Sequence, residues 1–155
     1  MKFQDMNAAQ MIASAGGVGF APRAPGTFGS LVGVLIGAVL LQMGHGPLLA
    51  GVIVSSVIGV WAVWAVGGQN DPGWIVIDEV AGQMLTMLAL PRVSAAGLLI
   101  AFGLFRLFDI WKPGPVGIAD QRHDAIGVMA DDWAAGAIGF CFLAILAWLL
   151  PGRWL

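Results

Sequence analysis

The sequence predicts an all-α protein, a polytopic bundle of about five to six helices embedded in a membrane. Its composition supports this fold class: 59% of the residues are hydrophobic and 23 more are glycine, whereas a typical soluble domain is about 45–50% apolar with glycine included. Only 10% of the 155 residues are charged, against about 25% in a soluble domain. Residues 24–70 and 133–152 contain no charged side chain, and a membrane-spanning helix needs about 20 such residues.

The uncharged stretches and the segment between them predict the helices in order. The first stretch is long enough for two spans, separated by the turn signal Gly44-His45-Gly46-Pro47. Spans are therefore expected at residues 29–43, 48–66, 93–110 and 132–150. Residues 111–131 are expected to form a polar loop, and residues 1–28 an interfacial or re-entrant segment. The length predicts a single domain over residues 1–155.

Residues 80–90 are apolar but too short to cross a membrane. Eleven helical residues rise about 17 Å, whereas the hydrocarbon core of a bilayer is about 30 Å thick. One alternative is a short helix buried inside the bundle, starting at Asp78. The other is a longer helix that begins near Trp74 and places Asp78 and Glu79 within the membrane or at its edge.

The charges also exclude several functional classes. A duplex-binding protein needs clustered Lys and Arg to neutralise phosphates, and this chain has a net charge of −2, so no nucleic-acid partner is expected. A single cysteine, Cys141, excludes an internal disulfide and a cysteine-rich metal cluster.

The basic residues predict the orientation in the membrane. A cytoplasmic N-terminus places five of them on the cytoplasmic side, which agrees with the positive-inside rule. These five are Lys2, Arg23, Arg106, Lys112 and Arg122, with Arg92 and Arg153 on the other side. In this topology three predicted helices begin on the cytoplasmic side, namely those at 29–43, from Asp78 onward and at 132–150. Most of the charged residues therefore gather at this one end of the bundle.

Two acidic pairs are the strongest candidates for chemistry. Asp78-Glu79 and Asp131-Asp132 each open an apolar helix, and residues 78–82 resemble residues 132–136. Carboxylates on facing helices suit Mg²⁺, although acids at helix N-termini also simply complement the helix dipole. Ionisable residues near lipid are usually functional, which favours a metal site. Its candidate ligands are Asp78, Glu79, Asp109, Asp131 and Asp132.

Four residues are candidates for binding a phosphate. Arg106 lies three residues before Asp109, so the two either form an ion pair or bind phosphate and metal respectively. Lys112 is either a phosphate ligand or an interfacial anchor. Gly26 and Thr27 lie in a Gly-rich turn that leads into a helix, where free N–H groups bind anions, although an ordinary helix cap has the same composition.

Two further features have simpler interpretations. Gly29, Gly33 and Gly37 are spaced by four, the pattern of small residues that lets helices pack closely. His123 is either a general acid/base or an ordinary loop histidine.

Segments 19–30, 75–82, 105–115 and 127–136 together resemble the phosphatidylglycerophosphatase A family, in the family's order. The resemblance implies a Mg²⁺-dependent lipid phosphatase of the bacterial inner membrane, and the orientation predicted from the basic residues places its active site on the cytoplasmic side. Such an enzyme converts the phospholipid phosphatidylglycerophosphate to phosphatidylglycerol in phospholipid biosynthesis. The chain departs from the family's pattern between Asp120 and Gly127, where the family usually has paired glycines, so no role is carried over to His123 or Asp124.

We hypothesise that Asp78, Glu79, Asp131 and Asp132 are the catalytic residues and that they hold one or two Mg²⁺ ions, with Asp109 as a fifth candidate ligand. Attack by a metal-activated water and an aspartyl-phosphate intermediate both remain open. A cation- or proton-coupled small transporter is the alternative function, since it would also carry carboxylates in the membrane. A purely structural membrane subunit would account for the glycines but not for the acids.

Overall fold

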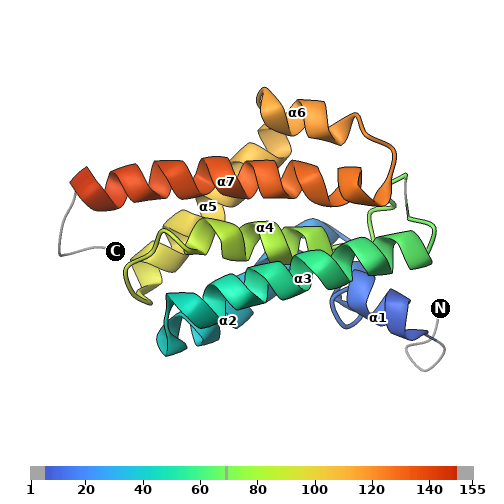
Figure 1. Ribbon diagram of the computed structural model, residues 1–155, viewed down its shortest axis with the longest axis horizontal. Helices are drawn as coiled ribbons and strands as arrows, with labels where there is room; N and C mark the ends of the chain where they lie inside the picture. The colour runs from blue at the N-terminus through green and yellow to red at the C-terminus, as the bar shows by residue number, and fades with distance from the viewer. Residues whose placement is uncertain (1–5, 69, 150–155) are drawn as a thin grey trace.

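The computed structural model describes residues 6–68 and 70–149, which form a helical bundle without a strand (Figure 1). The predicted all-α class is therefore confirmed. The described residues contain seven α-helices, more than expected, because α1 and α6 are only six residues long and hydropathy does not reveal them. The elements are α1 (Ala8–Ala13), the 3₁₀ turn η2 (Val18–Phe20), α2 (Pro25–Met43), α3 (His45–Ala65), α4 (Ile77–Met87), α5 (Ala95–Trp111), α6 (Pro115–Asp120) and α7 (Ala125–Leu149).

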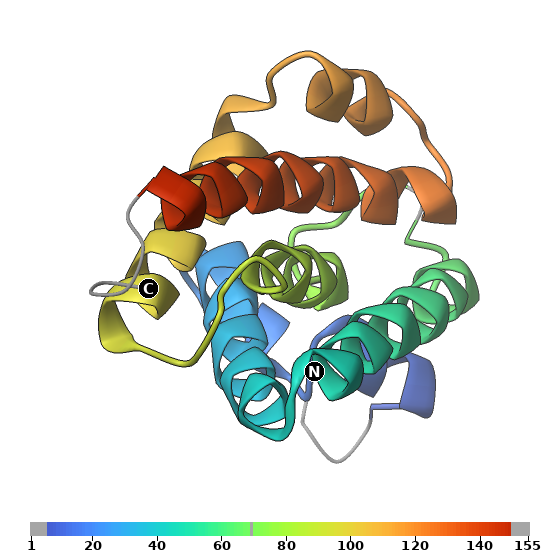
Figure 2. The same ribbon diagram turned by 60° about the vertical axis from the view of Figure 1, so that its left-hand side comes forward.

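Three of these helices, α2, α3 and α7, are long and apolar enough to cross a membrane. Their outer faces expose large apolar side chains such as Leu35, Val57 and Trp148. The short helix α4 begins at Ile77 and not near Trp74, so the alternative of a short buried helix is the right one. It packs against α2, α3, α5 and α7, and Figure 2 shows it enclosed between α2, α3 and α7.

The structure corrects several predicted boundaries. α2 begins at Pro25, four residues before the predicted start, and α3 begins directly after Gly44, so the predicted four-residue turn is a single glycine at φ +121°. The polar loop predicted at 111–131 is wrong, because it contains α6 and the first two turns of α7. A side-chain cap explains the early start of α7: Oδ1 of Asp124 accepts a hydrogen bond from the N–H of Gly127 at 2.6 Å.

This correction changes the position of Asp131 and Asp132. They do not open α7 but lie about two turns inside it, whereas Asp78 and Glu79 do lie in the first turn of α4. The helix dipole acts mainly within the first turn. The dipole interpretation therefore applies to Asp78 and Glu79 only.

Glycines bring α4 into backbone contact with the helices on two of its sides. The predicted packing role of Gly29, Gly33 and Gly37 is confirmed, since a Cβ at Gly33 would lie 2.9 Å from the carbonyl oxygen of Val80 in α4. Comparable clashes with α4 or the residue before it would occur at Gly29 and Gly37.

The contact between α4 and α7 is equally close. A Cβ at Gly82 would lie 2.6 Å from the carbonyl oxygen of Asp132, and a Cβ at Gly136 would lie 2.5 Å from the carbonyl oxygen of Gly82. The hydroxyl of Thr86 donates across this contact to the carbonyl oxygen of Gly136 at 3.2 Å. Since a backbone carbonyl cannot move away alone, any larger residue at either glycine forces the helices apart.

We expect the substitution Gly136→Ala to destabilise the bundle by about 1–3 kcal/mol, the usual cost of overpacking. The matched control is Gly103→Ala, because Gly103 is also helical but has no atom within 4 Å of an added Cβ. Alanine favours a helix over glycine by about 1 kcal/mol, so the control should be neutral or stabilised. The measurement is the apparent melting temperature in detergent; equal melting temperatures for the two variants would contradict the packing argument.

Candidate active site

The candidate site lies where the N-terminal parts of α2, α4 and α7 meet the C-terminal end of α5. α4 and α7 run side by side in the same direction (Figure 1), which brings Asp78 close to Asp132. The start of α2 reaches the same place: a Cβ at Gly26 would lie 2.2 Å from Oε1 of Glu79 and 3.3 Å from Nη1 of Arg106 in α5. The structure thus confirms that these helix ends converge.

Three carboxylates form the centre of the site. Asp78, Glu79 and Asp132 each offer one oxygen, and these oxygens all lie within 4.8 Å of one another. The residues Asp78 and Asp132 are only 5% and 3% exposed. Each lies four residues, or about one helical turn, before a glycine of the α4–α7 contact. The similarity between residues 78–82 and 132–136 therefore reflects equivalent positions on two touching helices.

The donor set fits a hard divalent cation. Three carboxylates this close together in an apolar bundle, two of them buried, repel one another unless a cation compensates their charge, and oxygen ligands of this kind suit Mg²⁺. Oε2 of Glu79 is buried and has no hydrogen-bond partner within the described residues. The site therefore has acidic oxygens available for a metal.

Asp109 and Arg106 lie at the edge of the carboxylate cluster. Nη1 of Arg106 donates to Oδ2 of Asp109 at 2.5 Å and lies 3.5 Å from the hydroxyl oxygen of Ser30. Asp109 is also a charged neighbour of Glu79 and Asp132. The ion pair considered from the sequence is formed, and it holds the guanidinium group next to the cluster.

Asp131 and Lys112 form a second ion pair outside the cluster. Nζ of Lys112 donates to Oδ2 of Asp131 at 2.9 Å and also to Oδ1 of Asp120. Partial burial acts to lower the pKa of Lys112, but the hydrogen bonds to the two carboxylates outweigh it and raise the pKa, so the ammonium group stays charged. Asp131 therefore lies beside the cluster, not among its three converging carboxylates.

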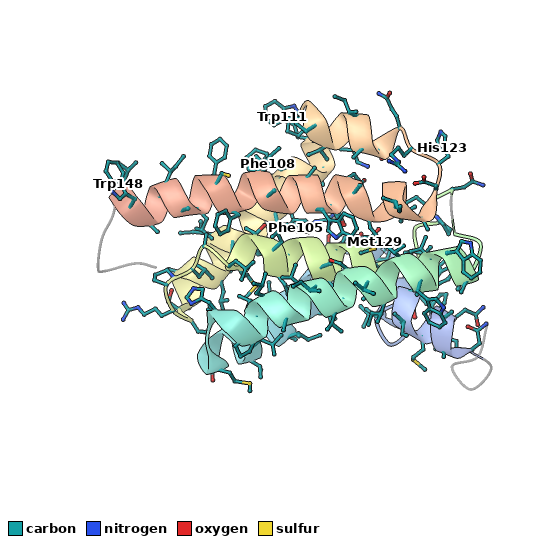
Figure 3. All side chains as sticks on the ribbon, in the orientation of Figure 1. Phe105, Phe108, Trp111, His123, Met129 and Trp148 are labelled. Carbon is teal, nitrogen blue, oxygen red and sulfur yellow. The ribbon has the colours of Figure 1, made fainter. Side chains whose placement is uncertain are left out.

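The remaining predicted residues lie around the cluster. Gly26 and Thr27 are in the first turn of α2, where Gly26 contacts Glu79 and Thr27 is partly exposed. His123 lies in the turn before α7 (Figure 3). Asp124 caps α7 and forms an exposed ion pair with Arg122.

Sequence reasoning missed two polar residues beneath the cluster. Ser30 is fully buried, and its hydroxyl donates to the carbonyl oxygen of Gly26 at 2.8 Å. Gln83 is also fully buried, one turn below Glu79, and within the described residues its amide atoms have no partner. Two features of the sequence could have indicated these residues. Ser30 follows Gly26 by four residues, or about one helical turn, and Gln83 carries the one amide in the apolar segment 80–90.

Residues 11–147 match the family model of phosphatidylglycerophosphatase A. The chain belongs to the phosphatidylglycerophosphatase A family. Two relatives carry that name: one from Haemophilus influenzae is 34% identical over 96% of this chain and 95% of its own length, and one from Escherichia coli is 33% identical over 79% and 73%. A relative from Bacteroides thetaiotaomicron named as a putative phosphatidylinositol-3-phosphatase is 33% identical over 90% of this chain and 94% of its own length. No solved structure matches.

In this phosphatidylglycerophosphatase A family member, the matched region contains α2, α4 and α5 and all of α7 except its last two residues. The relatives from Haemophilus influenzae and Bacteroides thetaiotaomicron are named for lipids with different headgroups, although their sequence identities to this chain are nearly equal. Overall identity therefore does not decide which headgroup is recognised.

We expect Gly26→Ala to weaken divalent-cation binding by about tenfold, or about 1.4 kcal/mol. The new Cβ would displace Oε1 of Glu79, which is the end of a side chain, so the fold should persist while the cluster is disturbed. Gly46→Ala is the control, because nothing lies within 4 Å of a Cβ there. The measurement is the rise in melting temperature with increasing Mg²⁺. An equal response of both variants would show that Gly26 does not support the cluster.

Proposed function

We propose that this chain is a Mg²⁺-dependent phosphatase that hydrolyses the terminal phosphomonoester of phosphatidylglycerophosphate to give phosphatidylglycerol. The observation that carries the proposal is the convergence of Asp78, Glu79 and Asp132 at one end of an apolar bundle. Membership of the family and the names of two relatives support the reaction and the substrate.

In the proposed site, Asp78, Glu79 and Asp132 hold the metal, and Asp109 and Asp131 complete its surroundings. Mg²⁺ bound there supplies a Lewis acid that polarises the phosphoryl oxygens and lowers the pKa of a bound water. Asp78, Glu79 and Asp132 form the cluster, and Asp109 lies at its edge. Asp131 lies beside the cluster in an ion pair with Lys112.

Three cationic or N–H donor groups surround the position of the phosphate. The planar guanidinium of Arg106 suits two phosphate oxygens at once, and its ion pair with Asp109 holds it beside Gly26. In the first turn of α2, Pro25 has no N–H and the N–H groups of Thr27 and Phe28 are bonded to the carbonyl oxygen of Ala24. The N–H of Gly26 and the hydroxyl of Thr27 are therefore the donors proposed for an anion at this helix start. Lys112 adds a positive charge beside the cluster, where its ion pair with Asp131 compensates the negative charge of that carboxylate.

Both routes for the chemical step involve the same residues. In the first, a carboxylate of the cluster accepts a proton from water as the water oxygen bonds to phosphorus and the bond to the glycerol oxygen breaks. In the second, an aspartate oxygen bonds to phosphorus as the bond to the glycerol oxygen breaks, and water then cleaves the aspartyl-phosphate to inorganic phosphate and the free aspartate. In both, the departing glycerol oxygen takes up a proton.

The proposed location is the bacterial inner membrane, with the site on the cytoplasmic side. The apolar outer faces of α2, α3 and α7 support a position in lipid. The excess of basic residues on the side of the acidic helix ends supports the orientation. The transporter alternative is less well supported, because the carboxylates gather at one end of the bundle and α4 and α7 run parallel, not inverted.

The test is phosphate release from phosphatidylglycerophosphate and from phosphatidic acid by the purified protein in detergent, with Mg²⁺ and with a chelator. We expect Asp78→Asn and Asp132→Asn to lower the Mg²⁺-dependent rate by at least about a hundredfold, since each removes a charge from the cluster. Asp124→Asn is the matched control, because Asp124 is outside the cluster and asparagine caps a helix equally well.

Full Mg²⁺-dependent activity in Asp78→Asn and Asp132→Asn would overturn the proposed site. Ion flux in liposomes without phosphate release would instead support the transporter alternative.

A further inference from the structure

A polar cavity of about 260 Å³ lies at the start of α7, next to the carboxylate cluster. It shares Asp131 with the surroundings of the cluster, and Asp131 directly precedes Asp132. The cavity combines the segment before α4, the end of α6 and the first turns of α7. Its lining residues are Asn70, Asp71, Asp120, Arg122, His123, Gly127, Val128 and Asp131.

The lining is suited to a small group that carries hydroxyls. Asp71 and Asp131 offer carboxylate acceptors, Asn70 offers both a donor and an acceptor, and His123 offers a ring nitrogen. Ligand pockets typically measure about 300–1,000 Å³, so this cavity suits a small group and not an acyl chain.

The charges of the lining argue against a second phosphate or a second metal. Three carboxylates line the cavity and would repel a phosphate, and the one arginine of the lining, Arg122, is already paired with Asp124. Nζ of Lys112 already lies between Asp120 and Asp131, where it supplies the positive charge that a cation would bring. A neutral polyol, whose hydroxyls donate to carboxylates, satisfies this lining without an added charge.

We propose that the cavity is a headgroup pocket that binds the polyol between the terminal phosphate and the rest of the lipid. The phosphate then lies at Asp78, Glu79 and Asp132, one residue along α7 from the pocket wall at Asp131. The inference rests on the proposed function, because it gives a binding site to the polyol of the same substrate whose phosphate is cleaved. Both lipids in the relatives' names carry their phosphate on a polyol, a glycerol or an inositol.

The pocket predicts how the enzyme distinguishes lipid phosphates. In phosphatidic acid the phosphate is attached directly to diacylglycerol, so no polyol can enter the cavity. A site built to hydrogen-bond a hydroxyl disfavours a substrate without it, because its polar groups remain unpaired. Asn70 and His123 therefore contribute to the binding of phosphatidylglycerophosphate and not to that of phosphatidic acid.

The test compares Asn70→Leu and His123→Phe with the unchanged protein in mixed micelles with Mg²⁺. Both substitutions keep the approximate side-chain size, and neither touches the carboxylate cluster. We expect the ratio of kcat/KM for phosphatidylglycerophosphate to that for phosphatidic acid to fall about tenfold, mainly through KM. The matched control is His45→Phe, the same change at the other end of the bundle, where His45 bonds to the carbonyl oxygen of Leu90. Any cost of losing that bond appears in the melting temperature and not in the ratio.

A second measurement does not depend on cleavage of phosphatidic acid. Glycerol phosphate and inorganic phosphate are compared as inhibitors of phosphatidylglycerophosphate cleavage. We expect the pocket variants to weaken inhibition by glycerol phosphate about tenfold and to leave inhibition by inorganic phosphate unchanged.

Three results would overturn the pocket. One is an unchanged ratio together with unchanged inhibition. Another is an equal fall for both lipids, which would place His123 or Asn70 in the chemical step. If the unchanged protein releases no phosphate from either lipid, the proposed function fails, and the pocket inference fails with it.

Discussion

The backbone contact between α4 and α7 is the constraint on which the site depends. Gly82 and Gly136 let the two helices approach until a Cβ at either position would collide with a carbonyl oxygen of the other helix. The carbonyl that Gly82 meets belongs to Asp132, so the contact acts directly on a residue of the cluster. The distance between packed helices increases with the size of the side chains at their contact, so larger residues at these two positions would draw Asp78 and Asp132 away from each other.

The same contact brings negatively charged side chains close together inside an apolar bundle, where they repel one another. Asp78 and Asp132 are almost fully buried, and Glu79 adds a third carboxylate within 4.8 Å. The neighbouring cations compensate this charge only in part, because Arg106 is paired with Asp109 and Lys112 with Asp120 and Asp131. These pairs compensate mainly the acids at the edge, so full compensation of the central three carboxylates would need a cation from solution.

Composition and spacing predicted the parts of the fold that follow from one-dimensional patterns. Uncharged stretches identify the long helices, and the length of segment 80–90 led to the short central helix. The spacing of Asp78 and Asp132 from their glycines was visible, but which glycines touch depends on how α4 and α7 cross. The start of α7 was missed because the uncharged stretch that marked this helix begins only at residue 133, so the apolar residues 125–130 before Asp131 were assigned to the loop. Only the cap by Asp124 shows where the helix begins. The pairing of Asp131 with Lys112 depends on side-chain direction, which spacing does not give.

The four-residue spacing between acid and glycine has a further consequence for how the bundle tolerates its site. One turn places each carboxylate on the same side of its helix as the glycine that makes the contact, so closer packing of α4 against α7 also presses the carboxylates together. At the N-terminal part of the α4–α7 contact, favourable helix packing is therefore opposed by repulsion between the carboxylates. A cation that binds the folded cluster, and not the unfolded chain, adds its binding free energy to the stability of the bundle. The central helix is thus held by glycine contacts along most of its length, whereas at its N-terminal turn a bound cation would balance the charge of the carboxylates.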